Sequence, residues 1–273
     1  MSLQARIKKI QDLINDYPRQ FWLLMFASFI DRLGGALLFP FFTLYVTRKF
    51  DIGMTQVGVL FGLFSFSAMF GGLLGGGLSD KLGRKGTLIL GLMASAISSV
   101  FMGLAESLTV FFLIALISGV FSEAGGPARQ AMVADLLPEN KRAEGFGIFR
   151  VVFNLSVAIG PAIGGLLASR SYLLLFIADA IASTITAVLI FIILRETRPK
   201  KDENTEPETM SATFQGYGKV LKDRIFMAFI FANILMGIVY VQMNSTLSVY
   251  LRDFHGILEQ QFGYIMSLNA GMV

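Results

Sequence analysis

Apolar residues fill the chain in repeated blocks of about 20 residues, separated by short polar connections. A helix of ~20 residues crosses the ~30 Å hydrocarbon core of a bilayer, and the blocks are too long and too uniformly apolar for the alternating strands of a membrane β-barrel. We therefore expect an all-α polytopic membrane protein. The predicted spans are, in order, Phe21–Tyr45, Gln56–Gly77, Thr87–Ala105, Val110–Leu136, Gly145–Ala168, Tyr172–Leu194, Ile225–Leu251, and an eighth that begins near Phe262 and is cut off at Val273.

Two polar segments flank the first six predicted spans. Residues 1–20 carry mixed charges with apolar residues at helical spacing, which predicts a short cytoplasmic helix at the membrane interface rather than a cleavable signal peptide. Residues 195–224 are charged and have too little apolar surface to fold alone, so we interpret them as a cytoplasmic linker. The expected domains are the segment 1–20, a six-helix bundle over 21–194, the linker 195–224, and the beginning of a second bundle over 225–273.

The basic residues are distributed unevenly between the two ends of the predicted spans. Sixteen of the 23 Lys and Arg residues fall on the side of the N-terminus and four on the opposite side, while Arg32, Arg129 and Arg150 fall within spans. Cytoplasmic loops carry an excess of Lys and Arg, so we predict that the N-terminus is cytoplasmic. This asymmetry explains the net charge of +4 without nucleic-acid binding.

The connection between the second and third predicted spans, from Gly75 to Gly86, is a short hairpin rich in glycine and charge. Its spacing resembles the signature loop that the major facilitator superfamily carries at this place; the matching residues are Gly76, Leu78, Asp80, Lys81, Gly83, Arg84 and Lys85. The resemblance implies two six-helix halves that rock about a central site, here a complete first half with the first one or two helices of the second. Anchoring at the cytoplasmic face is the alternative, but it explains only the three bases.

The resemblance also implies a function for this loop, because in the superfamily it latches the two halves together in the outward-facing state. Asp80 is then expected near the start of a helix in the second half, beyond Val273. Arg84 is expected to pair with an acid at the end of the fourth span, and Asp135 is the candidate.

The fifth predicted span contains a second motif, Gly160-Pro161-Ala162-Ile163-Gly164-Gly165. It resembles the motif that marks drug and proton antiporters within the superfamily, although Ser156 stands where the fuller pattern has another glycine. Proline removes one backbone hydrogen bond and bends a helix, and closely spaced glycines let a neighbouring backbone approach. A kinked packing helix without transport significance is the alternative. Leu33, Gly34 and Pro40 match a first-span pattern of the same exporters only weakly.

Two acids and two arginines within the predicted spans are candidates for proton coupling. A charge at the membrane centre costs about 2.5 to 3.5 kcal/mol on insertion scales unless it faces a partner or water. Asp31 is therefore either a proton- or cation-binding carboxylate or half of an inert ion pair, and Glu123 is a second buried acid. Arg32 and Arg129 are the candidate counter-charges, with Arg150 as a further possibility. Many exporters carry an arginine in the fourth span where this chain has Ala115.

Other polar residues in the spans are candidates for lining a substrate path, although each is also suited to a hydrogen bond between helices. They are Asn154, Asp179, Asn233, Gln242 and Asn244. His255 is expected in solvent.

Composition and motifs argue against several classes of function. The chain has no cysteine and shows no phosphate-binding loop, metal-ligand spacing or nucleophile arrangement, so an enzyme, an ATP-driven pump, a metal site and a cofactor all lack support. We expect a monomeric transporter of the bacterial inner membrane that exports small amphipathic compounds in exchange for protons. The alternatives are a metabolite transporter for sugars or organic anions, or a truncated product without transport activity, since the chain ends inside an apolar helix.

Overall fold

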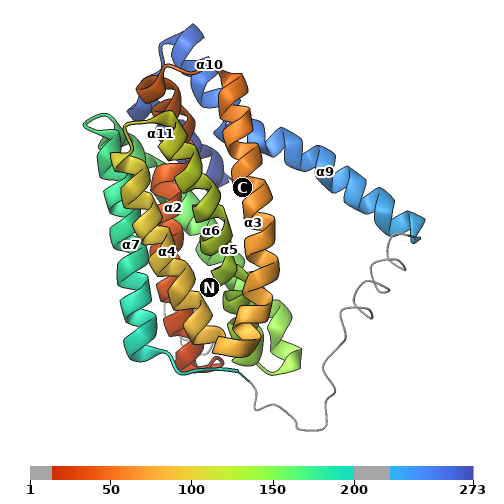
Figure 1. The fold of residues 1–273 in the computed structure, drawn as a ribbon. Helices are drawn as coiled ribbons and strands as arrows, with labels where there is room; N and C mark the ends of the chain where they lie inside the picture. Colours follow the sequence, from red (N-terminus) through yellow and green to blue (C-terminus); the bar gives the residue numbers. More distant parts are fainter. Residues whose placement is uncertain (1–13, 199–221, 273) are drawn as a thin grey trace, which may run out of the picture.

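The computed structural model describes residues 14–198 and 222–272, and the regular structure in these ranges is α-helical (Figure 1). Predictions that fall on residues 1–13 and 199–221 lie outside the described residues. Among the described residues, seven helices, α2 to α7 and α9, are long and apolar enough to cross a membrane. The helices are α2 (Arg19–Phe50), α3 (Met54–Leu82), α4 (Arg84–Leu104), α5 (Leu108–Asp135), α6 (Glu139–Ala168), α7 (Tyr172–Ile193), α9 (Arg224–Asn244), α10 (Thr246–His255) and α11 (Glu259–Met272).

Helices α2 to α7 form one upright bundle (Figure 1). Within it α3 packs along α5, α4 lies between α5 and α7, and α2 lies against α6 and α7. Glycines permit the closest of these contacts: a Cβ on Gly71 or Gly75 of α3 would overlap the backbone of Val120 or Ala124 of α5. The four-residue spacing of small residues thus brings two membrane helices together at backbone distance.

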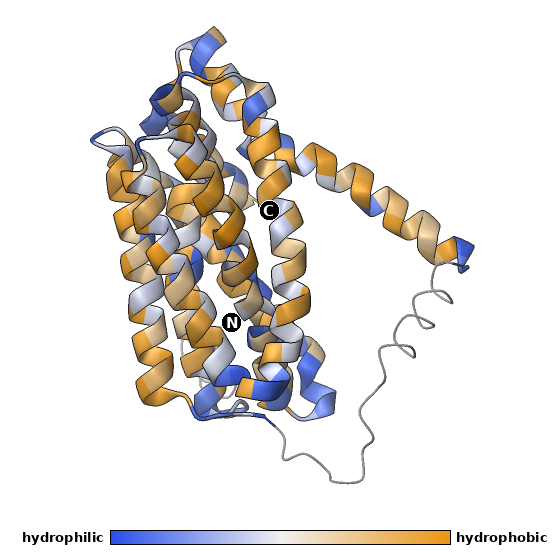
Figure 2. Ribbon diagram, viewed as in Figure 1, coloured by the Kyte–Doolittle hydropathy of each residue, from blue (hydrophilic) through white to orange (hydrophobic). Residues whose placement is uncertain are grey.

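The sides of the bundle are apolar and its two ends are polar (Figure 2). Large apolar side chains on the outer faces, such as Phe66, Leu73 and Phe191, are exposed in the isolated chain. Such a surface fits lipid rather than water, because a soluble domain rarely exposes contiguous apolar patches of this size. The chain is therefore a multi-pass membrane protein.

The last three helices contact the bundle unequally. Helix α9 points away from it (Figure 1) and buries none of its residues. Helix α10 contacts α2 and α9, and α11 packs along α6.

The structure corrects several predicted boundaries, most of all at the signature loop. Residues up to Leu82 continue α3 and Arg84 begins α4, so only Gly83 separates the helices. Gly83 has φ = 90°, a conformation that other residues rarely adopt, which is why one residue suffices for the turn.

The predicted seventh span, Ile225–Leu251, is also interrupted. It breaks at Ser245, whose hydroxyl donates to the carbonyl of Val241 at 2.8 Å. Such back-bonding by serine bends helices. The first span extends five residues past its predicted end, to Phe50, and the last described helix begins at Glu259 rather than Phe262.

Candidate functional site

A cavity lies inside the bundle between two buried clusters, one around Phe21 and Met132 and the other around Tyr45 and Phe111. It consists of two adjoining chambers. The polar chamber, of about 400 Å³, contains the charged side chains of Asp31, Arg32, Glu123, Arg129 and Asp179. The aromatic chamber, of about 220 Å³, is walled by Phe39, Phe42, Phe61 and Phe64. Seven residues line both chambers: Gly35, Phe39, Phe64, Ser95, Ser122, Glu123 and Asp179.

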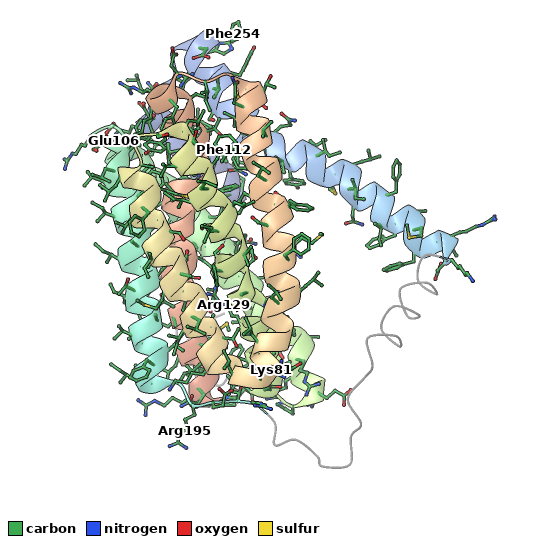
Figure 3. The ribbon with its side chains drawn as sticks, viewed as in Figure 1. Lys81, Glu106, Phe112, Arg129, Arg195 and Phe254 are labelled. Carbon is green, nitrogen blue, oxygen red and sulfur yellow. The ribbon has the colours of Figure 1, made fainter. Side chains whose placement is uncertain are left out.

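Asp31 and Arg129 form an ion pair across the polar chamber. Arg129 Nη2 lies 2.6 Å from Asp31 Oδ2, and the side chains are 6% and 14% exposed. The other oxygen, Oδ1, accepts a hydrogen bond from the hydroxyl of Ser183 at 3.3 Å. Arg129 lies inside the bundle, nearer the end that Lys81 and Arg195 mark than the opposite end (Figure 3). The counter-charge of Asp31 is thus Arg129, 98 residues away, and not the adjacent Arg32.

Arg32 and Arg150 occupy different environments. The guanidinium of Arg32 lies 5.7 Å from the centre of the Phe153 ring, within the range of a cation–π contact. Its Nε is buried and has no hydrogen-bond partner among the described residues. Arg150 is exposed and does not line either chamber.

Glu123 and Asp179 face the chambers without a basic partner. Glu123, which precedes Gly125, Gly126 and Pro127 in α5, is exposed and not the buried acid that the sequence predicted, whereas Asp179 is a buried residue of α7. Within residues 14–198 and 222–272, neither carboxylate lies within ion-pair distance of a basic group. Each is therefore available to a proton or to a ligand.

The other candidate path residues lie away from both chambers. Asn154 is exposed on α6, and the amide of Asn233 donates to the carbonyl of Phe229 in its own helix. Gln242 accepts a hydrogen bond from Thr246, and the backbone carbonyl of Asn244 accepts one from Thr43. Of the five candidates, only Asp179 lines a chamber.

A charged cluster occupies the end of the bundle where α3, α4 and α5 meet; Lys81 and Arg195 mark this end in Figure 3. Arg84 is its centre. Its Nη1 donates to Asp80 Oδ1 at 2.6 Å and its Nε to Asp135 Oδ2 at 3.4 Å. Lys85 Nζ donates to the carbonyl of Phe191 at 2.8 Å. The structure therefore brings Arg84 to Asp80 of the signature loop and to Asp135 at the end of α5.

Glu196, which follows α7, is a member of this cluster that sequence reasoning missed. Its carboxylate accepts four backbone hydrogen bonds, from Arg84 at 2.9 Å, Lys85 at 3.2 Å, Thr197 at 3.0 Å and Arg198 at 2.9 Å. Burial raises the pKa of Glu196, but these donors outweigh burial and hold the pKa below its ordinary value of 4.5. Glu196 thus caps the N-terminus of α4 from 112 residues away.

The glycines of the signature motif differ in their surroundings. A Cβ on Gly83 would overlap the Glu196 carboxylate, so this glycine serves both the turn and the cap. Gly76 has open space around its Cβ position, and nothing in the structure explains why this residue is a glycine.

The motif of the fifth span lies between two other helices. Gly160 and Gly164 contact the backbone of α2, and Gly165 contacts the backbone of Glu259 and Gln260 in α11. The backbone N–H of Ala162, which follows Pro161, donates to the Ser267 hydroxyl of α11 at 2.9 Å. The motif therefore permits close packing on both sides of α6.

Comparison with known proteins identifies the family. Residues 24–273 match the Major Facilitator Superfamily profile. The chain belongs to this superfamily. Its relatives within the superfamily are transporters: the Na(+), Li(+), K(+)/H(+) antiporter of Planococcus maritimus is 28% identical over 253 residues, which cover 88% of this chain and 59% of the relative. The quinolone resistance protein NorA of Staphylococcus aureus is 26% identical over 200 residues, covering 71% and 50%. The chain thus spans about half the length of the curated relatives it matches.

Solved structures of the Major Facilitator Superfamily type share the fold of this chain. A bacterial homologue of the human lysosomal transporter Spinster aligns with a TM-score of 0.76 at 16% identity, over 92% of this chain and 59% of that one. The nucleoside transporter NupG aligns with a TM-score of 0.74 at 16% identity, over 92% and 65%. At this identity the likeness shows the fold alone.

Proposed function

We propose that this superfamily member is a secondary transporter that exports small amphipathic compounds in exchange for protons. The observation that carries the proposal is the meeting of the two chambers at Glu123. The aromatic chamber suits the apolar part of a substrate, and the carboxylate accepts either a proton or a polar, cationic group of the substrate. Because one carboxylate cannot hold both at once, the two ligands compete, which is the basis of exchange. The relatives named as an antiporter and a drug-resistance protein support this proposal.

Asp31, Glu123, Arg32 and Arg129 are the proposed coupling residues. Asp31 exchanges a proton only when its pair with Arg129 opens, because the guanidinium occupies one of its oxygens at 2.6 Å. Glu123 has no such constraint among the described residues, so it is the stronger candidate for the coupling acid. Arg32 and Arg129 set the balance of charge in the polar chamber.

The proposal includes the arrangement of the whole transporter. Residues 21–194 form the first half, 195–224 the cytoplasmic linker, and 225–273 the beginning of the second half. The signature motif latches the halves through Asp80, and the protein works as a monomer in the bacterial inner membrane with its N-terminus in the cytoplasm.

A second candidate function is exchange of monovalent cations for protons. It is favoured by the relative from Planococcus maritimus, a Na(+), Li(+), K(+)/H(+) antiporter, and by the three acids of the polar chamber. The aromatic wall has no role in this alternative, which is why we rank it second.

Everted membrane vesicles containing the protein distinguish the two functions. With an acid lumen, we expect accumulation of an amphipathic fluorescent dye, and Glu123→Gln should abolish accumulation while downhill dye exchange persists. A single cysteine in place of Asn140 should react with an impermeant thiol reagent in these vesicles, and one in place of Ser107 should not. Proton movement on addition of Na⁺ or K⁺, without dye accumulation, would support the second function instead.

A further inference from the structure

Asp179 occupies a distinctive place in α7. It is 8% exposed and lines both chambers, and Glu123, an exposed residue of α5, lines the same two chambers. Opposite Asp179, α2 carries Gly34, where a Cβ would lie 2.7 Å from the Cβ of Ala182 and 3.1 Å from Asp179 Oδ1. A glycine at this position thus permits close packing of α2 on α7 beside the carboxylate.

The charged groups that share the chambers with Asp179 come from α2 and α5, and uncharged groups come from other helices. Helix α4 supplies the hydroxyls of Ser95 and Ser99, and α6 supplies Phe153 and Val157. The charged groups that share its chambers are Asp31 and Arg32 on α2 and Glu123 and Arg129 on α5.

None of these basic groups forms an ion pair with Asp179. Arg129 is engaged by Asp31, and the guanidinium of Arg32 lies over the Phe153 ring. Ser183, one turn along α7 from Asp179, donates to Asp31 instead. In the described part of the chain no basic group lies within 4.0 Å of the Asp179 carboxylate, and a buried carboxylate is stable only when a proton, a cation or water compensates it.

We propose that Asp179 is a second proton-carrying carboxylate, which works together with Glu123 in the same cavity. This inference rests on the proposed function, since it concerns how many protons that transporter exchanges. In the resting cavity both side chains are carboxylic acids. When a cationic substrate enters, each O–H bond breaks, the proton leaves to water, and the two carboxylates compensate the substrate's charge. Asp31 is not one of these two acids, because it exchanges a proton only when its pair with Arg129 opens.

The number of exchanged protons decides whether export responds to the membrane potential. Two protons against one monovalent cation move a net charge across the membrane, so export responds to the membrane potential as well as to the pH gradient. One proton against one monovalent cation is electroneutral. The protein without the Asp179 carboxyl group should therefore export such a cation at a rate independent of the potential.

Proton release on binding tests the inference directly. The purified protein in weakly buffered detergent solution is titrated with tetraphenylphosphonium, a monovalent amphipathic cation, and released protons are counted with a pH dye. We expect about two protons per bound cation for the unsubstituted protein and about one for Asp179→Asn, by proton linkage. The conservative variant Asp179→Glu should restore the second proton, a result that a purely structural role does not produce.

Two other outcomes would distinguish a failure of the proposal for Asp179 from a failure of the proposed function. If the unsubstituted protein releases one proton and Glu123→Gln releases none, Asp179 is not a proton carrier, although exchange stands; this result needs no Asp179 variant and is independent of how that variant folds. If the unsubstituted protein binds the cation without releasing any proton, the proposed function fails and the inference with it.

Discussion

The charged cluster at the end of the bundle and the polar chamber inside it differ in whether their acidic side chains have partners. In the cluster Arg84 contacts two acids, and Glu196 accepts four backbone hydrogen bonds. In the chamber Asp31 is paired, while Glu123 and Asp179 have no basic partner among the described residues. Compensated charges hold helices in place. A carboxylate without a counter-charge in a cavity would destabilise the fold, which is why we propose that Glu123 and Asp179 bind protons and substrate.

Arg129→Met should have the largest effect on stability. It leaves Asp31 buried without its counter-charge, which costs about 3 to 5 kcal/mol, because a lone charge keeps its desolvation penalty. The double variant Asp31→Leu with Arg129→Met removes both charges and should lose much less. The free energy of unfolding is measured by SDS titration from dodecyl maltoside micelles. Equal losses for the single and the double variant would show that the pair does not compensate Asp31.

Asp135→Asn should have an intermediate effect, with Asp80→Asn as its matched control. Asp80 is closer to Arg84, at 2.6 Å against 3.4 Å, but its side chain is 73% exposed and that of Asp135 only 16%. Burial should outweigh distance, since exposed ion pairs contribute about 0 to 1 kcal/mol and buried charged hydrogen bonds about 1.5 to 3. The same titration measures both variants. A loss for Asp80→Asn as large as that for Asp135→Asn would contradict this ranking.

The sequence predicts the spans well because a membrane helix is a local pattern, in which about 20 apolar residues suffice whatever they contact. The sequence predicts poorly which charged side chains of different helices form ion pairs. The sequence left Arg32, Arg129 and Arg150 open as the counter-charge of Asp31, and only the structure selects Arg129, which lies on another helix. The position of Asp135 near Arg84 was expected only through the family resemblance. Long-range pairs depend on how helices pack, and no periodicity in one helix encodes that.

For the charged cluster around Arg84, an experiment designed from the sequence alone would also be misleading. A charge swap between Arg84 and Asp135 is the natural test of a simple pair. In the structure the swapped Asp at position 84 would face Asp80, which lies 2.6 Å from the present guanidinium. Like charges would then meet whether or not the pair with Asp135 exists, so single neutral substitutions are the sharper test.

Glu196→Gln should have the smallest effect, with a characteristic dependence on pH. The amide keeps one acceptor oxygen but loses the charge that four backbone donors and the N-terminus of α4 stabilise, so we expect a loss of about 1 kcal/mol at pH 7. The expected loss is that of a helix-cap substitution, because Glu196 is an exposed residue whose charge is screened by solvent.

The sign of the pH effect follows from the lowered pKa of Glu196. A carboxylate whose pKa is depressed on folding contributes its full stabilisation above the unfolded pKa, near 4.5, and loses it as the pH falls through the folded value. The difference in unfolding free energy between the unsubstituted protein and Glu196→Gln should therefore be constant from pH 7 to pH 6 and shrink below pH 4.5. Because both proteins share every other titrating group, subtracting them isolates Glu196. A difference that stays constant down to pH 3 would mean that the charge of Glu196 does not stabilise the cap, and the cluster would then owe its order to Arg84 and Asp135 alone.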